Sequence, residues 1–137
     1  MAKFSRKQVW QRAGHRCEYC LLPQSESVLP HELDHIRAKK HRGRTILKNT
    51  CVACAYCNSA KGTDAAAYDP DTEALVPLFN PRSDRWEQHF RWKGPELRGR
   101  TAVGRATVEL LRINEPARVE HRRLLMAAGL LFTAKKA

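Results

Sequence analysis

Two Cys-x-x-Cys pairs, Cys17/Cys20 and Cys54/Cys57, bracket the part of the chain that carries its most reactive side chains. A two-residue spacer lets one tight turn aim both sulfurs at one ion, and two such pairs complete a tetrahedral thiolate set for Zn²⁺. The spacing therefore predicts a structural zinc site. Cys51 precedes Cys54 by three residues, so a Cys51/Cys54 pair is an alternative; left unpaired, Cys51 is typical of a small core residue.

Four polar side chains stand between or directly after these pairs: Asp34, His35, Asn49 and Asn58. Asp34 and Asn58 offer hard oxygen donors suited to Mg²⁺ or Mn²⁺. His35 can act as a base near neutral pH, and the Asn49 amide can donate and accept at once. Because neighbours on a regular strand face opposite ways, Asp34 and His35 can serve one site only where the strand ends or twists.

Several short elements must position these residues. A capping box at Ser5 and a left-handed stop at Gly14 predict a helix over residues 6–13. Residues 28–36 read as a strand interrupted near Pro30, and residues 45–47 as a second short strand. A further helix is expected to open at Asn58. The predicted order is helix, zinc turn, two-stranded ribbon, zinc turn, helix.

The composition changes after Tyr68, where a turn and an irregular proline-bracketed stretch lead to a predicted hairpin of residues 90–92 and 96–98. A helix capped by Thr101 or Thr107 should reach Ile113, and another should run from Pro116 to about residue 128. The side chains expected to face inward from these two helices are Val103, Leu110, Leu111, Val119, Leu124 and Leu125. Residues 130–137 are expected to fray.

The chain is strongly basic, with a formal net charge of +11. Residues 37–48 contain no acid and carry Arg37, Lys39, Lys40, Arg42, Arg44 and Lys48, with His41 among them. A solvated loop is the bland interpretation of such a run. Its place beside Asp34-His35 and between the cysteine pairs favours contact with phosphates, so nucleic acid is the expected partner.

The arrangement resembles the HNH endonuclease family, whose fold is the ββα-metal or His-Me finger. The matching residues are Gly14, Cys17, Cys20, Asp34, His35, Asn49, Cys54, Cys57, Asn58 and Lys61, which make this the His-Asn-Asn variant with a four-cysteine zinc site. The strong match covers residues 14–64. The segments LFNPRSDRWEQHF and GRATVELLRIN also resemble the tail of a bacterial subgroup, and phage proteins use such sites too. The expected fold is α+β, with an irregular hairpin segment and C-terminal helices after the core.

The resemblance implies that the protein is a metal-dependent DNA endonuclease. His35 would be the general base, Asp34 and Asn58 would bind one Mg²⁺ or Mn²⁺, and Asn49 would brace the loop that orients His35. Lys61 and the basic run would contact the DNA backbone. The family often has a Gly-Gly pair in this loop, whereas this chain reads His41-Arg42-Gly43-Arg44. A zinc-stabilised DNA-binding module without turnover is the alternative, and a zinc scaffold for protein partners is a third.

Two parts are expected: residues 1–67 as the nuclease core with its N-terminal helix and zinc site, and residues 68–137 as an extension packed on it. With no apolar run near the roughly 18 residues of a membrane span and no signal-peptide pattern, we expect a cytoplasmic protein with no membrane partner. Pairing as a homodimer is left open. His31 is interpreted as a plain strand residue rather than one lining the site, and Trp86, Phe90 and Trp92 as packing rather than base-stacking residues.

Overall fold

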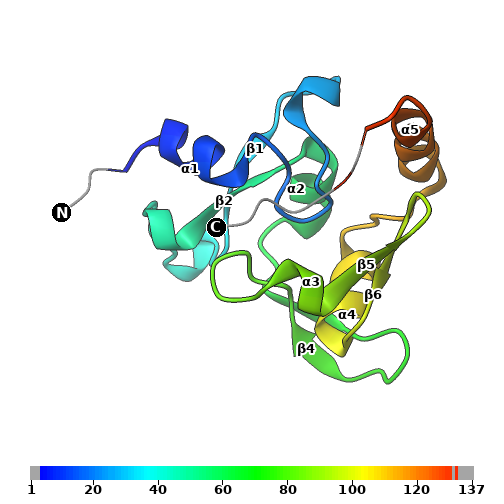
Figure 1. Ribbon diagram of the computed structural model, residues 1–137. Coiled ribbons are helices and arrows are strands. Elements are labelled where there is room, and N and C mark those ends of the chain that lie inside the picture. Colours follow the sequence, from blue (N-terminus) through cyan, green and yellow to red (C-terminus); the bar gives the residue numbers. More distant parts are fainter. Residues whose placement is uncertain (1–3, 131, 133–137) are drawn as a thin grey trace.

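The computed structural model describes residues 4–130 and residue 132, and it shows an α+β chain of short elements (Figure 1). The N-terminal half contains α1 (Arg6–Ala13), β1 (Glu32–His35), β2 (Thr50–Ala53) and α2 (Ala55–Lys61). The C-terminal half contains β3 (Ala66–Tyr68), β4 (Leu75–Pro77), α3 (Trp86–His89), β5 (Phe90–Lys93), β6 (Glu96–Gly99), α4 (Ala102–Leu110) and α5 (Pro116–Ala127). The described strands pair as three antiparallel ribbons, β1–β2, β3–β4 and β5–β6.

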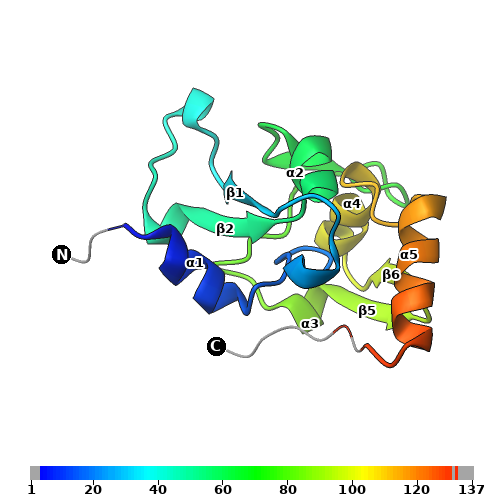
Figure 2. The same ribbon diagram turned by 90° about the horizontal axis from the view of Figure 1, so that it is seen from above.

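Helix α1 has the predicted bounds. The Ser5 hydroxyl accepts from the Gln8 amide at 3.4 Å, and Gly14 ends the helix in the left-handed region at φ 67°. Val9 and Ala13 are buried and pack with Val52 of β2, which Figure 2 shows running beside α1. This helix therefore covers one side of the β1–β2 ribbon.

The β1–β2 ribbon corrects the predicted strand positions. Only the last part of the predicted 28–36 strand pairs, as β1. The second strand is β2 at residues 50–53 rather than 45–47, and it places Cys51 opposite Asp34 and Thr50 opposite His35. All four residues of β2 are buried, so the strand has no polar–apolar alternation that could reveal it in the sequence.

Helix α2 begins at Ala55, earlier than the expected start at Asn58. Cys54 is its N-cap, and the Cys54 Sγ accepts from the Cys57 amide at 3.4 Å. The second cysteine pair thus forms the first turn of the helix. Asn58 follows one turn later, and its backbone N–H donates to the Cys54 carbonyl at 2.9 Å.

The C-terminal half agrees in part with the sequence. The β5–β6 hairpin and the start of α5 at Pro116 are confirmed, and Thr101 rather than Thr107 caps α4. Helix α4 ends at Leu110 instead of reaching Ile113. The β3–β4 ribbon was not predicted, because its strands have only three residues each.

The buried side chains of helix α5 are arginines rather than the expected Val119, Leu124 and Leu125. Arg118 and Arg122 are buried, whereas Leu124 is 54% exposed and Val119 and Leu125 are only partly buried. Guanidinium groups can face inward here because the surface beneath offers carbonyl oxygens and cysteine sulfurs as acceptors. Sequence patterns that score burial by hydropathy cannot anticipate such acceptors.

Of the tail expected to fray, residues 131 and 133–137 lie outside the described residues. Phe132 is buried, with its ring centroid 5.5 Å from that of Trp92, so this position packs rather than frays.

One hydrophobic core joins both halves of the chain. Tyr19 contacts Phe79 edge to face, and Phe79 contacts Phe90 in the same manner. Trp86 packs on Phe90 and donates its indole N–H to the Tyr19 carbonyl at 2.9 Å. The aromatic side chains after residue 78 therefore hold the first zinc turn in place. Within the described residues, no helix has both the length and the apolar character needed to span a membrane.

Candidate functional site

The four cysteine sulfurs of the two Cys-x-x-Cys pairs meet in the interior. The Sγ atoms of Cys17, Cys20, Cys54 and Cys57 all lie within 4.8 Å of one another, and all four residues are buried. The Cys20 and Cys54 sulfurs are 3.7 Å apart, which matches the edge of about 3.8 Å expected for tetrahedral zinc with bonds of about 2.3 Å. The donor set therefore fits a structural zinc ion.

Cys51 is separate from this cluster. Its sulfur lies 3.3 Å from Asp34 Oδ2 and 3.6 Å from the Tyr19 hydroxyl. The alternative Cys51/Cys54 pair is thus excluded, and Cys51 is the buried core residue that the sequence favoured.

Asp34 is buried and committed on both oxygens. Oδ1 pairs with the Lys61 ammonium at 3.1 Å, and Oδ2 accepts from the Tyr19 hydroxyl at 2.7 Å. Burial, together with the neighbouring Cys51 and Asp34, raises the pKa of Tyr19 well above its ordinary value, so the phenol remains a donor. Lys61, expected at the DNA backbone, is instead 2% exposed and also donates to the His35 carbonyl at 3.2 Å.

Asn58 lies on the same side of α2 as Lys61, but nearer the surface. Its amide nitrogen donates to Glu32 Oε2 at 2.6 Å. Glu32 was not singled out from the sequence, because an isolated acid at the start of a strand is common. Asp34 and Glu32 are two residues apart on β1, so both carboxylates face α2.

His35 is the last residue of β1 and is partly exposed. Its Nε2 is hydrogen-bonded to the Thr45 hydroxyl at 2.9 Å. Burial and the Lys39 charge lower the pKa of His35 below its ordinary value, although the Asp34 charge opposes this shift. The lowered pKa favours the neutral imidazole, which is the form that accepts a proton.

Asn49 closes the base of the loop that follows His35. Its Oδ1 accepts from the Arg37 amide at 2.8 Å, and its Nδ2 donates to the carbonyls of Arg37 and Arg44 at 3.0 and 2.9 Å. The Asn49 carbonyl also accepts from the Ile36 amide at 2.9 Å. One side chain and its own backbone thus fix both ends of the loop.

Residues 17–64 match the model of the HNH endonuclease family. This central segment is therefore similar to that family. The chain is also 26% identical over 128 residues to the Septu protein PtuB of Bacillus thuringiensis, in an alignment that covers 92% of this chain and 47% of PtuB. The chain therefore spans about half the length of this curated relative. No solved structure matches this chain.

The basic loop of the HNH segment projects beyond the β1–β2 ribbon (Figure 2). Its exposed cationic and histidine side chains are Arg37, Lys39, Lys40, His41, Arg42, Arg44 and Lys48. Gly43 is the position where the loop tolerates no side chain, because a Cβ there would lie 1.6 Å from the Arg37 carbonyl oxygen. Gly43, the one glycine where the HNH family often has a Gly-Gly pair, is thus required because the Arg37 carbonyl lies so close to it.

Arg118 binds the zinc sulfurs of the HNH segment from outside it. Its Nη2 lies 3.0 Å from Cys57 Sγ and 3.8 Å from Cys54 Sγ, and its Nη1 donates to the Leu111 carbonyl at 2.7 Å. Burial lowers the pKa of Arg118, but the charges of the nearby cysteines outweigh it and raise the pKa above its ordinary value. The guanidinium therefore stays charged beside the thiolates.

One further predicted position, His31, has a structural role. His31 is buried, and its Nε2 is hydrogen-bonded to the Leu22 carbonyl at 2.8 Å. His31 therefore has a structural role, but it stands directly before β1 rather than within the expected strand.

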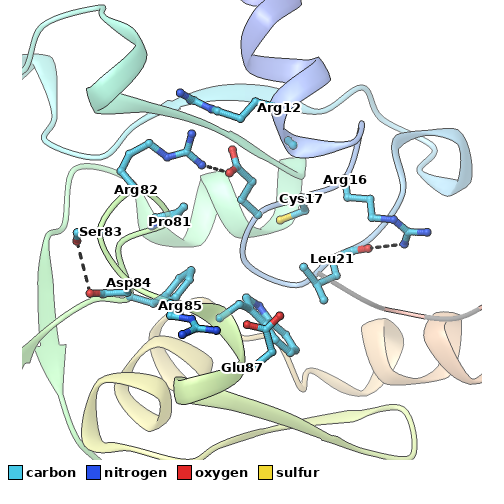
Figure 3. A pocket seen from close by; sticks show the side chains of 14 residues that line it. Arg12, Arg16, Cys17, Leu21, Pro81, Arg82, Ser83, Asp84, Arg85 and Glu87 are labelled. Carbon is cyan, nitrogen blue, oxygen red and sulfur yellow. Dashed lines mark hydrogen bonds and ion pairs between the residues drawn. The ribbon is translucent and has the colours of Figure 1, made fainter. Parts of the chain in front are cut away.

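A hollow of about 790 Å³ lies between α1, the first zinc turn and residues 79–87 (Figure 3). Arg12, Arg16, Arg82 and Arg85 line it, with Glu18 among them. Arg82 forms an ion pair with Glu18, and Arg16 donates to the Leu21 carbonyl at 3.1 Å. The zinc ligand Cys17 is among the lining residues, but Asp34, His35, Asn49 and Asn58 are not. The contacts of Arg82 and Arg16 hold neighbouring segments together.

Proposed function

We propose that this protein is a metal-dependent DNA endonuclease that hydrolyses phosphodiester bonds with His35 as the general base. The observation that carries the proposal is a partly exposed imidazole with a lowered pKa at the end of β1, inside a segment that matches the HNH family. A neutral imidazole next to a bound phosphodiester can take a proton from an attacking water.

Asp34 and Asn58 would hold one divalent ion, because a carboxylate and an amide carbonyl are the hard oxygen donors that Mg²⁺ and Mn²⁺ accept. Such an ion would supply charge stabilisation at the phosphoryl and leaving 3′ oxygens. Asp34 Oδ1 is paired with Lys61 in the structure, so ion binding would replace part of that contact.

The basic loop would position the DNA by its phosphates. The exposed cationic side chains from Arg37 to Lys48 belong to the loop that directly follows His35, so phosphate contacts there would bring a phosphodiester towards the imidazole. Asn49 would keep this loop in one conformation through its three side-chain hydrogen bonds.

A second function, a zinc-stabilised DNA-binding module without turnover, is favoured by one specific observation. Asp34 is buried and fully engaged by Lys61 and Tyr19. If this arrangement persists when ions are added, the protein would bind DNA with a steep salt dependence and cleave nothing.

The deciding experiment is conversion of supercoiled plasmid by the purified protein with Mg²⁺, Mn²⁺ or a chelator, beside His35→Ala. We expect nicked or linear product that requires both the ion and His35, and the two products would distinguish single-strand from double-strand cleavage. His121→Ala, on α5, is the matched histidine control and should cleave as the wild type does. Intact plasmid under every condition, with DNA still bound, would establish the binding module instead.

A further inference from the structure

Two pairs of polar side chains join strand β1 to helix α2. Along β1, Glu32 and Asp34 are two positions apart. Along α2, Asn58 and Lys61 are three positions apart, which is nearly one helical turn. Asp34 pairs with Lys61 in the interior, and Glu32 pairs with Asn58 nearer the surface. The buried Asp34–Lys61 pair accounts for how α2 is held against β1. The outer Glu32–Asn58 pair is therefore not required for this packing.

We propose that Glu32 is a positioning residue for the divalent-ion site, acting through the Asn58 side chain. The inference rests on the proposed function, because it concerns the same ion. The strand register places Glu32 opposite Ala53, the last residue of β2, which directly precedes Cys54, the N-cap of α2. The Glu32 carboxylate is thereby fixed beside the first turns of the helix that carries Asn58.

The chemistry of the amide gives this contact its consequence. An Asn side chain offers a carbonyl oxygen on one edge and an NH₂ group on the other, and its terminal torsion is broad unless a partner fixes it. A carboxylate only accepts, so Glu32 can face Nδ2 but repels Oδ1. The 2.6 Å contact between Glu32 Oε2 and Asn58 Nδ2 therefore selects the orientation that turns Oδ1 away from Glu32. That oxygen is the atom that a hard cation takes.

The test measures Mn²⁺ affinity of the zinc-loaded protein without DNA, by electron paramagnetic resonance of free Mn²⁺ or by calorimetry. Outer partners of metal ligands typically contribute 10- to 100-fold in affinity, so Glu32→Ala should weaken Mn²⁺ binding by about tenfold or more. Glu32→Gln should stay much closer to the wild type, because its carbonyl still accepts from Asn58 Nδ2. Glu26→Ala removes another exposed acid upstream of β1 and should leave the affinity unchanged.

A double-variant cycle then separates positioning from a simple charge effect. In an Asn58→Ala background, Glu32→Ala should cause no further loss, since there is no amide left to orient. A full additional loss in the double variant, or a Glu32→Gln protein as weak as Glu32→Ala, would overturn the inference. Melting temperatures and bound zinc equal to the wild type will show that each variant is folded.

Failure of the inference can be told from failure of the proposed ion site. If Asn58→Ala weakens Mn²⁺ binding and Glu32→Ala does not, Glu32 has no positioning role while the ion site stands. If Asn58→Ala binds Mn²⁺ as tightly as the wild type, the proposed ligand set is wrong and the role of Glu32 is overturned with it.

Discussion

Replacing Arg118 by Met should loosen the zinc site although no ligand is touched. Arg118 belongs to α5, far in sequence from the cysteines, yet its guanidinium lies 3.0 Å from Cys57 Sγ. Four thiolates on one Zn²⁺ leave a formal charge of −2, and this buried cation offsets part of it. Methionine keeps a flexible apolar stem of similar reach but removes the charge and every donor.

The magnitude follows from what the substitution leaves behind. Removing one partner of a buried charge pair typically costs about 3–5 kcal/mol, because the other charge stays buried without compensation. The carbonyls of Leu111 and Arg112, which accept from Arg118 at 2.7 and 3.1 Å, would also lose a donor. We therefore expect the free energy of unfolding to fall by about 3 kcal/mol, the lower end of that range. At roughly 4 °C per kcal/mol for a domain of this size, the melting temperature should drop by about 12 °C.

Two assays test this together: thermal melting of the zinc-loaded protein, and the rate of zinc transfer to a colorimetric chelator at a fixed temperature. Arg118→Met should melt earlier and lose zinc faster. Arg123→Met is the matched control on the same helix. Arg123 is 56% exposed and pairs with an exposed glutamate, so its loss should leave the melting temperature and the rate of zinc release close to those of the wild type.

Arg118→Lys separates the effect of the charge from that of the hydrogen bonds. It keeps the positive charge but loses the planar guanidinium group that reaches sulfur and carbonyls at once. It should lie between the wild type and Arg118→Met in both assays. If Arg118→Met melts and releases zinc as the wild type does, the contact with the thiolates has no energetic weight and the reasoning fails.

Three further predictions concern the rest of the fold. Cys54→Ser should lose zinc and most of the folded state, whereas Cys51→Ser should keep one zinc per chain, as metal analysis and circular dichroism can check. Gly43→Ala should unsettle the basic loop, since its Cβ would meet a carbonyl oxygen at 1.6 Å; faster hydrogen exchange confined to residues 37–48 would show this, and unchanged exchange would contradict it. The Arg105 guanidinium holds the pKa of Asp69 well below its usual range, so this carboxylate stabilises the fold fully above its unfolded pKa of about 3.9 and progressively less as pH falls through the lower folded value. Stability measured by denaturant titration between about pH 4 and pH 2 should therefore fall more steeply in the wild type than in Asp69→Asn, and parallel curves would refute the assignment.

The features that the sequence predicted well are those with a local signature. The helix at residues 6–13 has a capping hydroxyl and a glycine stop, and the hairpin at residues 90–99 has a Gly94-Pro95 turn between two segments that alternate polar and apolar residues. The zinc site has the two-residue cysteine spacing, and the HNH segment has residue types in a recognisable order. Each of these signals depends on residues close together in the chain.

The features that it missed depend on contacts between distant residues. The strand at residues 50–53 is buried on both faces, so its partners rather than its own pattern decide its conformation. The inward direction of Arg118 depends on thiolates 61 residues away in sequence, and nothing in the helix itself marks it. Glu32 gains significance only when α2 places Asn58 beside it.

Because both halves of the chain share one hydrophobic core, the HNH segment depends on the C-terminal half for its folding. An HNH segment cut from this chain after the second zinc turn would lack Trp86, which donates to the first zinc turn, and Phe79, which covers Tyr19. It would also leave behind Arg118, the cation beside the thiolates. We therefore expect a transplanted fragment to be insoluble, and a useful fusion to carry the chain through Phe132, whose side chain packs on Trp92. A fusion partner is then best attached beyond that residue.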